Sequence, residues 1–166
     1  TVQEVFGELS GQKLVFVGDG NNVAASLAIL SSMLDLPMTL ACPSGYELDE
    51  TVLAEIKKRY PDTQFTQVND PVAAVKDADV VYTDVWASMG QEKEALERTA
   101  AFADFQVNAE LLAAAPGASR FMHDLPARRG LEVTDEVMDG EQSIVFQQSE
   151  NRMHLAKGLL AWLMEV

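Results

Sequence analysis

Cysteine is almost absent from this chain, since Cys42 is the only one among its 166 residues. A single thiol excludes an internal disulfide and is typical of proteins in a reducing compartment, so we expect a cytoplasmic location. Cys42 directly follows the apolar run from Met38 to Ala41. That position favours a buried thiol at the end of a strand over a reactive nucleophile.

Basic residues and long apolar runs are also scarce. The chain has 12 Lys and Arg against 26 Asp and Glu, which gives a net charge of −14. Nucleic acids and anionic membranes are bound through clustered Lys and Arg, so we expect neither as a partner. No apolar run approaches the length of about 20 residues that a membrane span needs. No basic segment followed by an apolar one opens the chain as a leader.

The length suits a single domain. A domain of this size buries about 70% of the surface that its unfolded chain exposes, and a hydrophobic share of 48% is ordinary for a globular protein. The sequence begins with Thr1, without an initiator Met and in the middle of an apolar pattern. We therefore expect one domain over residues 1–166 that belongs to a longer protein.

Short apolar runs alternate with amphipathic segments along the chain. The predicted strands cover residues 13–18, 37–42, 65–68, 78–83 and 119–122. The predicted helices cover residues 21–34, 49–60, 70–76, 91–101, 108–115 and 149–164, with Asn108 as an N-cap and an extended piece at 143–146. Strands that alternate with helices predict parallel βαβ units. We expect an α/β fold, namely a three-layer Rossmann-like domain with a central parallel sheet of about five strands flanked by helices.

The segment from Asp84 to Glu92 directly follows a predicted strand. Open parallel sheets bind ligands beyond the carboxyl ends of their strands. At such a strand end the carboxylate of Asp84 can pair with an ammonium group. Ser88 fits a ligand-binding role and the cap of the next helix equally well. Trp86 and Met89 are residue types that more often pack than bind ligands.

The turn after the first predicted strand resembles a dinucleotide-binding fingerprint incompletely. Gly18 and Gly20 are in place, but Val23 occupies the third glycine position, and no acidic residue ends the second strand. A nicotinamide cofactor is therefore not expected. The glycines suit the strand-to-helix turn itself, whereas Asn22 near the helix N-terminus can offer a donor and an acceptor to a zwitterionic ligand.

A third polar segment is His123-Asp124-Leu125-Pro126. A proline in such a tight turn is a candidate for a cis peptide bond, which would turn the carbonyls of Asp124 and Leu125 toward a cleft as acceptors for an amide NH2. An isolated histidine is usually a core or loop residue. His123 beside Asp124 suggests a metal site or a catalytic dyad as an alternative. Adjacent side chains usually point in different directions, so we expect no metal.

The last polar segment opens the terminal helix. Glu150 in the first turn suits the helix dipole. Arg152 follows it, and arginine is most often a surface residue. An arginine that faces a cleft from a first helical turn can instead hold a phosphate or carbonyl oxygen.

Residues 18–22, 84–92, 123–126 and 150–152, in this order, resemble the ornithine carbamoyltransferases. The resemblance spans essentially the whole chain, and Ser-Met-Gly at 88–90 is its most specific part. It implies the carboxyl-terminal, ornithine-binding half of such an enzyme. The family transfers the carbamoyl group of carbamoyl phosphate to the side-chain amine of L-ornithine, which gives L-citrulline and phosphate without a cofactor.

The resemblance also implies roles for individual residues. Catalysis would fall to Asp84, Asp124 and Arg152. Substrate binding would fall to seven residues: Asn22, Asp84, Ser88, Met89, Asp124, Leu125 and Arg152. Of these, Asn22, Asp84 and Ser88 would bind the amino acid. The carbonyls around Asp124 and Leu125 would hold the carbamoyl NH2, and Arg152 would contact carbamoyl phosphate.

The chain departs from the family pattern in two respects. Asp124 occupies a position where the family has Cys. Its carboxylate would either stabilise the substrate ammonium and oppose attack, or accept the proton of the amine as a general base. The Ser-Thr-Arg-Thr phosphate signature of the family's amino-terminal domain is missing. That domain supplies the trimer interface, so we expect a homotrimer or a multiple of trimers for the full-length protein and little activity for this chain alone.

Two other functions stay open. Asp124 is compatible with a related carbamoyltransferase that acts on another amine, such as putrescine. Asn22 together with the Ser-Met-Gly turn favours an α-amino acid over a simple diamine. A non-catalytic amino-acid-binding module is the alternative from a different class.

Overall fold

The computed structural model describes residues 1–87 and 94–165. Within them, five strands form one sheet: β1 (Leu14–Val17), β2 (Met38–Ala41), β3 (Phe65–Val68), β4 (Val80–Thr83) and β5 (Arg120–His123). The spatial order is β3-β2-β1-β4-β5, and every pairing is parallel. The predicted α/β fold with a parallel sheet of about five strands is confirmed.

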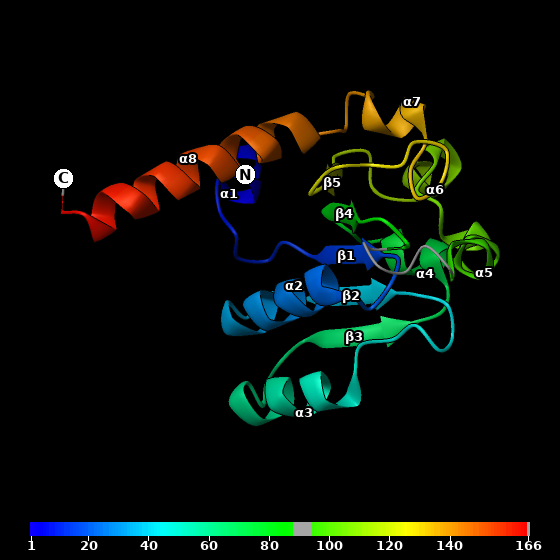
Figure 1. The fold of residues 1–166 in the computed structure, drawn as a ribbon, viewed down its shortest axis with the longest axis horizontal. Helices are drawn as coiled ribbons and strands as arrows, with labels where there is room; N and C mark the ends of the chain where they lie inside the picture. The colour runs from blue at the N-terminus through cyan, green and yellow to red at the C-terminus, as the bar shows by residue number, and fades with distance from the viewer. Residues whose placement is uncertain (88–93, 166) are drawn as a thin grey trace.

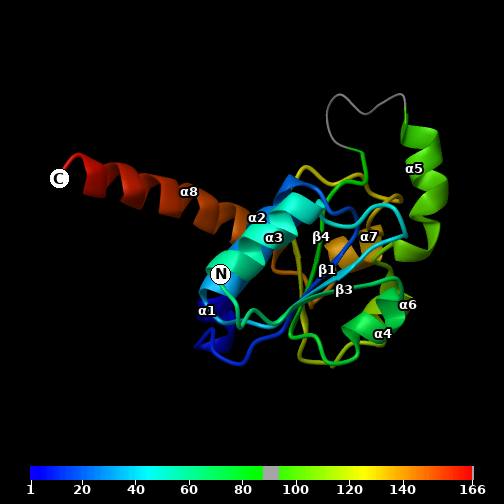
Figure 2. The same ribbon diagram turned by 90° about the horizontal axis from the view of Figure 1, so that it is seen from below.

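The helices cover both faces of the sheet. Their bounds are α1 (Val2–Phe6), α2 (Asn22–Met33), α3 (Glu50–Arg59), α4 (Pro71–Val75), α5 (Ala95–Ala101), α6 (Ala109–Ala113), α7 (Asp135–Met138) and α8 (Val145–Leu163), with a 3-10 turn at Ala103–Phe105. Figure 2 shows α2 and α3 on one side of the strands and α4, α5, α6 and α7 on the other. The three layers expected from the alternating pattern are therefore present.

The core divides along β1 because successive side chains of a strand point to opposite faces. Val15 and Val17 are fully buried in the cluster that includes α4, α6 and α7. Phe16 is fully buried in the cluster on the side of α2 and stacks on Tyr82 of β4. The central strand is thus apolar on both faces, which leaves its carboxyl end as the place where polar groups can gather.

Helix α8 begins inside the body and then leaves it. Val145 at its start is fully buried, whereas Leu155 and Trp162 are 74% and 75% exposed. Figure 1 shows the helix passing α1 and ending well beyond the sheet. Among the described residues, no helix is long and apolar enough to cross a membrane.

Two details differ from the sequence prediction. Helix α8 starts at Val145 rather than Ser149, so the predicted extended piece at 143–146 shrinks to a single bridge between Ser143 and Phe121. The short helix α1 was missed, because its pattern at the very start of the chain gives little periodicity. Other expectations hold, since Asn108 caps α6 and Cys42 is buried, which raises the pKa of its thiol to about 12.

Candidate functional site

The carboxyl ends of β1, β4 and β5 meet at one edge of the sheet. The hydroxyl of Thr83 donates to the carbonyl of Val17 at 2.6 Å and so ties the ends of β4 and β1 together. Gly20 allows the loop before α3 to approach, because a Cβ there would lie 2.4 Å from the backbone carbon of Glu47. This edge brings together residues far apart in the chain, as parallel sheets do.

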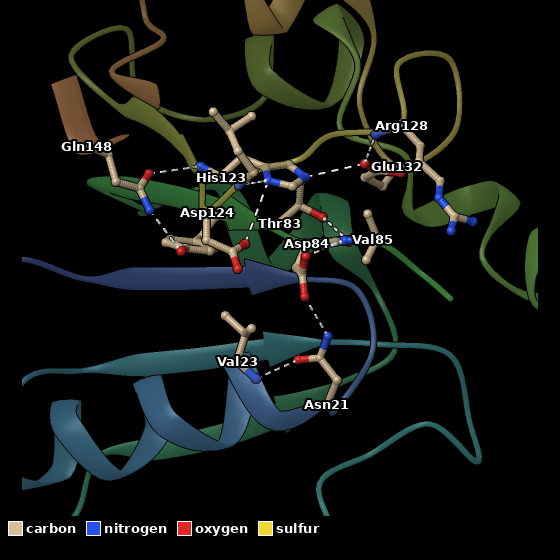
Figure 3. A network of polar contacts seen from close by, with 12 residues as sticks. Asn21, Val23, Thr83, Asp84, Val85, His123, Asp124, Arg128, Glu132 and Gln148 are labelled. Carbon is tan, nitrogen blue, oxygen red and sulfur yellow. Dashed lines mark hydrogen bonds and ion pairs between the residues drawn. The ribbon is translucent and has the colours of Figure 1, made fainter. Parts of the chain in front are cut away.

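Asp84 is the central carboxylate of this edge and is 8% exposed. Its Oδ2 accepts a hydrogen bond from Nδ2 of Asn21 at 2.8 Å, and its Oδ1 accepts one from the backbone N–H of Val85 at 2.7 Å (Figure 3). Asn21 is held in turn, because its Oδ1 caps α2 by accepting from the N–H groups of Val23 and Ala24 at 2.9 and 3.1 Å. Both oxygens of the Asp84 carboxylate therefore have a hydrogen-bond donor, and the arrangement fixes the carboxylate in place at the strand end.

Sequence reasoning named Asn22 at this place, and Asn21 is the asparagine that reaches Asp84. Asn22 is exposed as the first residue of α2, and its carbonyl accepts a hydrogen bond from the hydroxyl of Ser26. The N-cap rule applies to the residue before a helix. A helix start placed one residue later would have assigned the two asparagines correctly.

His123 is a buried structural residue. Its Nδ1 accepts a hydrogen bond from the backbone N–H of Leu125 at 2.9 Å, so the ring proton sits on Nε2, which faces Oε1 of Glu132 at 3.3 Å. Asp84, His123 and Asp124 each bring one potential metal-ligand atom to within 4.8 Å of the others. The Nδ1 atom of His123 already accepts the hydrogen bond from Leu125, so it offers no free metal ligand there.

Asp124 differs from Asp84 in its surroundings. Within the described part of the chain, its Oδ1 is buried without a hydrogen-bond partner. Burial, followed by the nearby charge of Asp84, raises the pKa of Asp124 to about 6. Figure 3 shows the two carboxylates facing one another across the strand ends. The site therefore holds one well-stabilised carboxylate and one that gains a proton near neutral pH.

The peptide bond between Leu125 and Pro126 is cis, as the sequence suggested. A groove of about 740 Å³ lies beside this turn and is lined by Asp124, Leu125, Pro126 and, from α8, Arg152. The structure thus places three of the predicted carbamoyl-side residues on one groove. Ser88 and Met89, predicted for the amino-acid side, lie outside the described residues.

Several residues that support the site carry no sequence signal. Gln148 of α8 accepts from the backbone N–H of His123 at 3.1 Å and donates to the hydroxyl of Tyr82 at 2.9 Å. Burial raises the pKa of Tyr82, so its hydroxyl stays protonated. Because these partners are 25 and 66 positions from Gln148, only the fold reveals the link.

Arg98 is a second hidden support. It is 8% exposed, and its guanidinium donates to Oδ2 of Asp19 at 2.7 Å and to the carbonyl of Trp86 at 2.9 Å. Its carbon Cζ lies 5.1 Å from the centre of the Tyr46 ring. Burial raises the pKa of Asp19, which Arg98 opposes. Arg98 therefore joins the segment after β4 to the turn after β1, the two segments that carry Asp84 and Asn21.

The sequence profile of the Asp/Orn-binding domain of aspartate/ornithine carbamoyltransferases matches residues 10–163. The chain belongs to this family. Membership places the polar edge described above in the family's Asp/Orn-binding domain, in agreement with the resemblance found in the motifs.

Named relatives agree with the family assignment. The chain is 52% identical over 166 residues to the anabolic ornithine carbamoyltransferase of Pyrococcus furiosus, covering 99% of this chain and 53% of the relative. It is 49% identical to the ornithine carbamoyltransferase of Anoxybacillus flavithermus, again over 99% of this chain and 53% of the relative. The chain spans about half of the length of the relatives that it matches.

Solved structures agree as well. The ornithine carbamoyltransferase from Pyrococcus furiosus superposes with a TM-score of 0.89 at 51% identity, covering 96% of this chain and 52% of that chain. The enzyme from Thermus thermophilus gives a TM-score of 0.83 at 39% identity, covering 98% and 51%. The Rossmann-like fold of this family domain is therefore the fold of this chain.

Proposed function

We propose that this chain is the amino-acid-binding domain of an ornithine carbamoyltransferase. The enzyme would transfer the carbamoyl group of carbamoyl phosphate to the side-chain amine of L-ornithine, giving L-citrulline and phosphate. The observation that carries the proposal is Asp84, a buried carboxylate held by Asn21 and Val85 at the end of β4. Among the described residues it forms no ion pair with Lys or Arg. A substrate ammonium would supply the missing cation.

The groove beside the cis turn suits the second substrate. Leu125 and Arg152 line the same groove, so the carbonyl of one would supply an acceptor for a carbamoyl NH2 and the guanidinium of the other a cation for phosphate oxygens. The amine and the activated carbonyl would then meet in a fixed geometry. Catalysis would come from this positioning and from stabilisation of the developing oxyanion.

The complete enzyme would need a second domain for carbamoyl phosphate. The exposed apolar residues on the outer part of α8 support this, since large apolar patches usually mark a surface that is covered by a partner. They are Leu155, Leu159, Leu160, Trp162 and Leu163. We further propose a cytoplasmic protein whose full-length form is a homotrimer or a multiple of trimers, as the family resemblance implies.

A substrate panel tests the proposal. The full-length protein is assayed for carbamoyl transfer from carbamoyl phosphate to L-ornithine, putrescine and N-acetylornithine, with product identified by mass. We expect citrulline as the main product and little transfer to the other two amines. Transfer to putrescine without transfer to ornithine would refute the ornithine assignment. A full-length protein that binds ornithine but transfers nothing would instead support a non-catalytic module.

One observation favours a diamine as the second candidate substrate. Asp124 adds a second carboxylate next to Asp84, and two anions suit a substrate with two ammonium groups and no carboxylate. The same panel decides this, because putrescine and ornithine differ only by the α-carboxylate.

A further inference from the structure

We infer that Gln148 is a positioning residue of the proposed reaction, because it sets where α8 presents Arg152 to carbamoyl phosphate. The inference rests on the proposed function, in which Arg152 is the contact for the phosphate. It goes beyond that function in naming the side chain that holds the arginine in place. Gln148 itself touches neither substrate and acts through the first turns of α8.

The start of α8 is docked on an edge strand. β5 is the last strand of the sheet, so one row of its backbone groups faces no other strand. The N–H of Phe121 donates to the carbonyl of Gln142 at 2.8 Å, and the N–H of Ile144 donates to the carbonyl of Phe121 at 3.0 Å. These bonds form one step of a parallel ladder, and His123 carries the next N–H on the same side of β5.

The side chain of Gln148 continues this ladder where the backbone turns into a helix. The carbonyl of Ile144 already accepts the backbone N–H of Gln148 at 2.9 Å, as the first turn of α8 requires. The N–H of His123 donates instead to Oε1 of Gln148 at 3.1 Å (Figure 3). His123 is buried, and a buried N–H without an acceptor is costly. This bond therefore fixes the first turn of α8 to the end of β5.

The other end of the same amide reaches a second strand. Nε2 of Gln148 donates to the hydroxyl of Tyr82 at 2.9 Å. Tyr82 lies in β4, directly before the end that carries Asp84, and its buried ring stacks on Phe16. The N–H of His123 requires an oxygen as acceptor, so only one orientation of the amide forms both bonds. One side chain thus joins α8 to the two strands whose ends form the site.

Arg152 lies one turn further along α8 than Gln148. Residues four apart share a face of a helix and lie about 6 Å apart along its axis. A second groove, of about 790 Å³, is lined by both residues together with Tyr82 and Asp124. Arg152 is exposed and forms no ion pair within residues 1–87 and 94–165, so the helix backbone sets the place of its guanidinium. A shift of the first turn of α8 therefore moves Arg152 relative to the site.

The other side-chain contacts of the early part of α8 point elsewhere. Gln147 donates to Glu4 at 3.2 Å, and Asn151 donates to the hydroxyl of Thr1 at 2.9 Å, so both tie the helix to α1 and its N-cap. In the described part of the chain, the side-chain hydrogen bonds between α8 and the sheet both come from Gln148. Gln147 is therefore a matched control, because it is a glutamine of the same helix whose hydrogen bond goes to α1.

The test is a double-mutant cycle of Gln148→Met and Arg152→Met in the full-length enzyme, followed by steady-state kinetics. Methionine keeps the length of the glutamine side chain and loses both hydrogen bonds. Gln148→Met should raise KM for carbamoyl phosphate by about 3- to 30-fold, and KM for ornithine at saturating carbamoyl phosphate should stay within about twofold. With Arg152→Met already present, the same change should raise KM for carbamoyl phosphate by less than about twofold, because no guanidinium is left to misplace. Gln147→Met should match the wild type.

A merely structural role of Gln148 predicts a different pattern. Loss of folded enzyme lowers kcat and leaves both KM values unchanged, so a wild-type KM for carbamoyl phosphate in Gln148→Met would overturn the inference. An equal rise in this KM with and without Arg152 would overturn it as well, since Gln148 would then act through another group.

Tyr82→Phe keeps the buried ring and removes only one of the two bonds. It should raise KM for carbamoyl phosphate by a smaller factor than Gln148→Met does. If Gln148→Met does not fold, Tyr82→Phe decides the question, and a wild-type KM in that variant counts against the inference.

The proposed function can fail separately from the inference. If the wild-type protein makes no citrulline, the proposed function is wrong, and binding of inorganic phosphate to the full-length protein is measured by calorimetry. Gln148→Met should then weaken phosphate binding, and only while Arg152 is present. Equal affinities of Gln148→Met and the wild type, including no measurable binding by either, would contradict the positioning role.

Discussion

The strand-end edge and the outer part of α8 are opposite kinds of surface on one small domain. At the edge, polar side chains are buried and bonded to one another, as Asn21 is to Asp84 and Arg98 is to Asp19. Along the outer α8, large apolar side chains such as Leu155 and Trp162 are exposed. The edge is therefore preorganised within this chain. The described residues leave the outer part of the helix uncovered.

The contrast between these surfaces indicates which half of the proposed two-substrate site this domain forms by itself. Under the proposed function the amino-acid side needs an anion, which Asp84 at the end of β4 would supply and which Asn21 and Val85 hold in place. The proposed carbamoyl side is a groove whose lining includes Leu125 and the exposed Arg152. Variants that loosen the edge test whether its hydrogen bonds hold the site together. Variants of the outer helix test whether it contributes little to the stability of this chain.

The largest effect on stability is expected at Arg98. Replacing it with methionine keeps the bulk but leaves Asp19 buried without its cation, which costs about 3–5 kcal/mol of unfolding free energy. Urea unfolding of this chain measures the loss. Arg129→Met is the matched control, because Arg129 pairs with Asp135 and Asp139 on the exposed surface and such pairs contribute about 0–1 kcal/mol. Equal losses in the two variants would contradict the buried support.

Asp84→Asn should have the largest effect on substrate use. Losing one partner of a buried charge pair costs about 2–5 kcal/mol, so kcat/KM for ornithine should fall about 30- to 4,000-fold in the full-length enzyme. Steady-state kinetics measure this. Asp49→Asn removes the same charge from the exposed N-cap of α3 and should leave kcat/KM unchanged. If Asp84→Asn behaves like that control, Asp84 does not bind substrate.

Asp124 should make stability depend on pH. Its pKa in the folded chain is raised from 3.8 to about 6, so the folded state holds the proton more tightly than the unfolded state does. The stability that this provides is complete below about pH 4 and is lost as pH rises through about 6. Asp124→Asn should therefore be more stable than the wild type at pH 7.5, by about 1–2 kcal/mol after allowance for partial exposure.

The measurement is urea unfolding of the wild type and Asp124→Asn at pH 4 and at pH 7.5. At pH 4 the two chains should have nearly equal free energies of unfolding, because both side chains are then uncharged. A stabilisation of the same size at both pH values would show that the effect comes from packing rather than from the charge of Asp124.

The smallest effect is expected on the outer α8. Replacing the exposed Leu159 and Trp162 with glutamine should change the unfolding free energy of this chain by less than about 0.5 kcal/mol, as for other surface positions. The same changes in the full-length protein should lower its stability by more, because there the helix would be covered. Val145→Ala at the buried start of the helix is the internal contrast and should destabilise the chain. An equal loss for both would end the distinction between the two parts of α8.

Much of the fold could be predicted from the sequence, because strands and helices leave periodic patterns. All five strands were anticipated within two residues at each end, and β3 was predicted with its observed bounds. The start of α8 was missed by four residues, since Val145 and Phe146 suit a strand as well as a helix. Local patterns do not distinguish these when the deciding contact is the packing of Val145 into a core built by distant segments.

The site was predicted in part. Asp84 was named from its position after a strand and Asp124 from the family resemblance, and the structure brings them together, because parallel strands end at one edge. Asn21 was confused with its neighbour Asn22, since the exact start of α2 depends on the turn. The supports Arg98 and Gln148 were not foreseen, because nothing in their sequence surroundings distinguishes them from surface residues.

The amino-acid sequence alone determined the alternating architecture, the family and the strand-end position of Asp84, because these follow from short-range periodicity and from motifs. Only the tertiary structure decided how charges are distributed at the edge. It shows that Nδ1 of His123 accepts a backbone hydrogen bond, that Asp84 is held by two donors and that Asp124 is left with a buried unpartnered oxygen. Protonation depends on burial and on neighbours from other strands, and those exist only once the chain has folded.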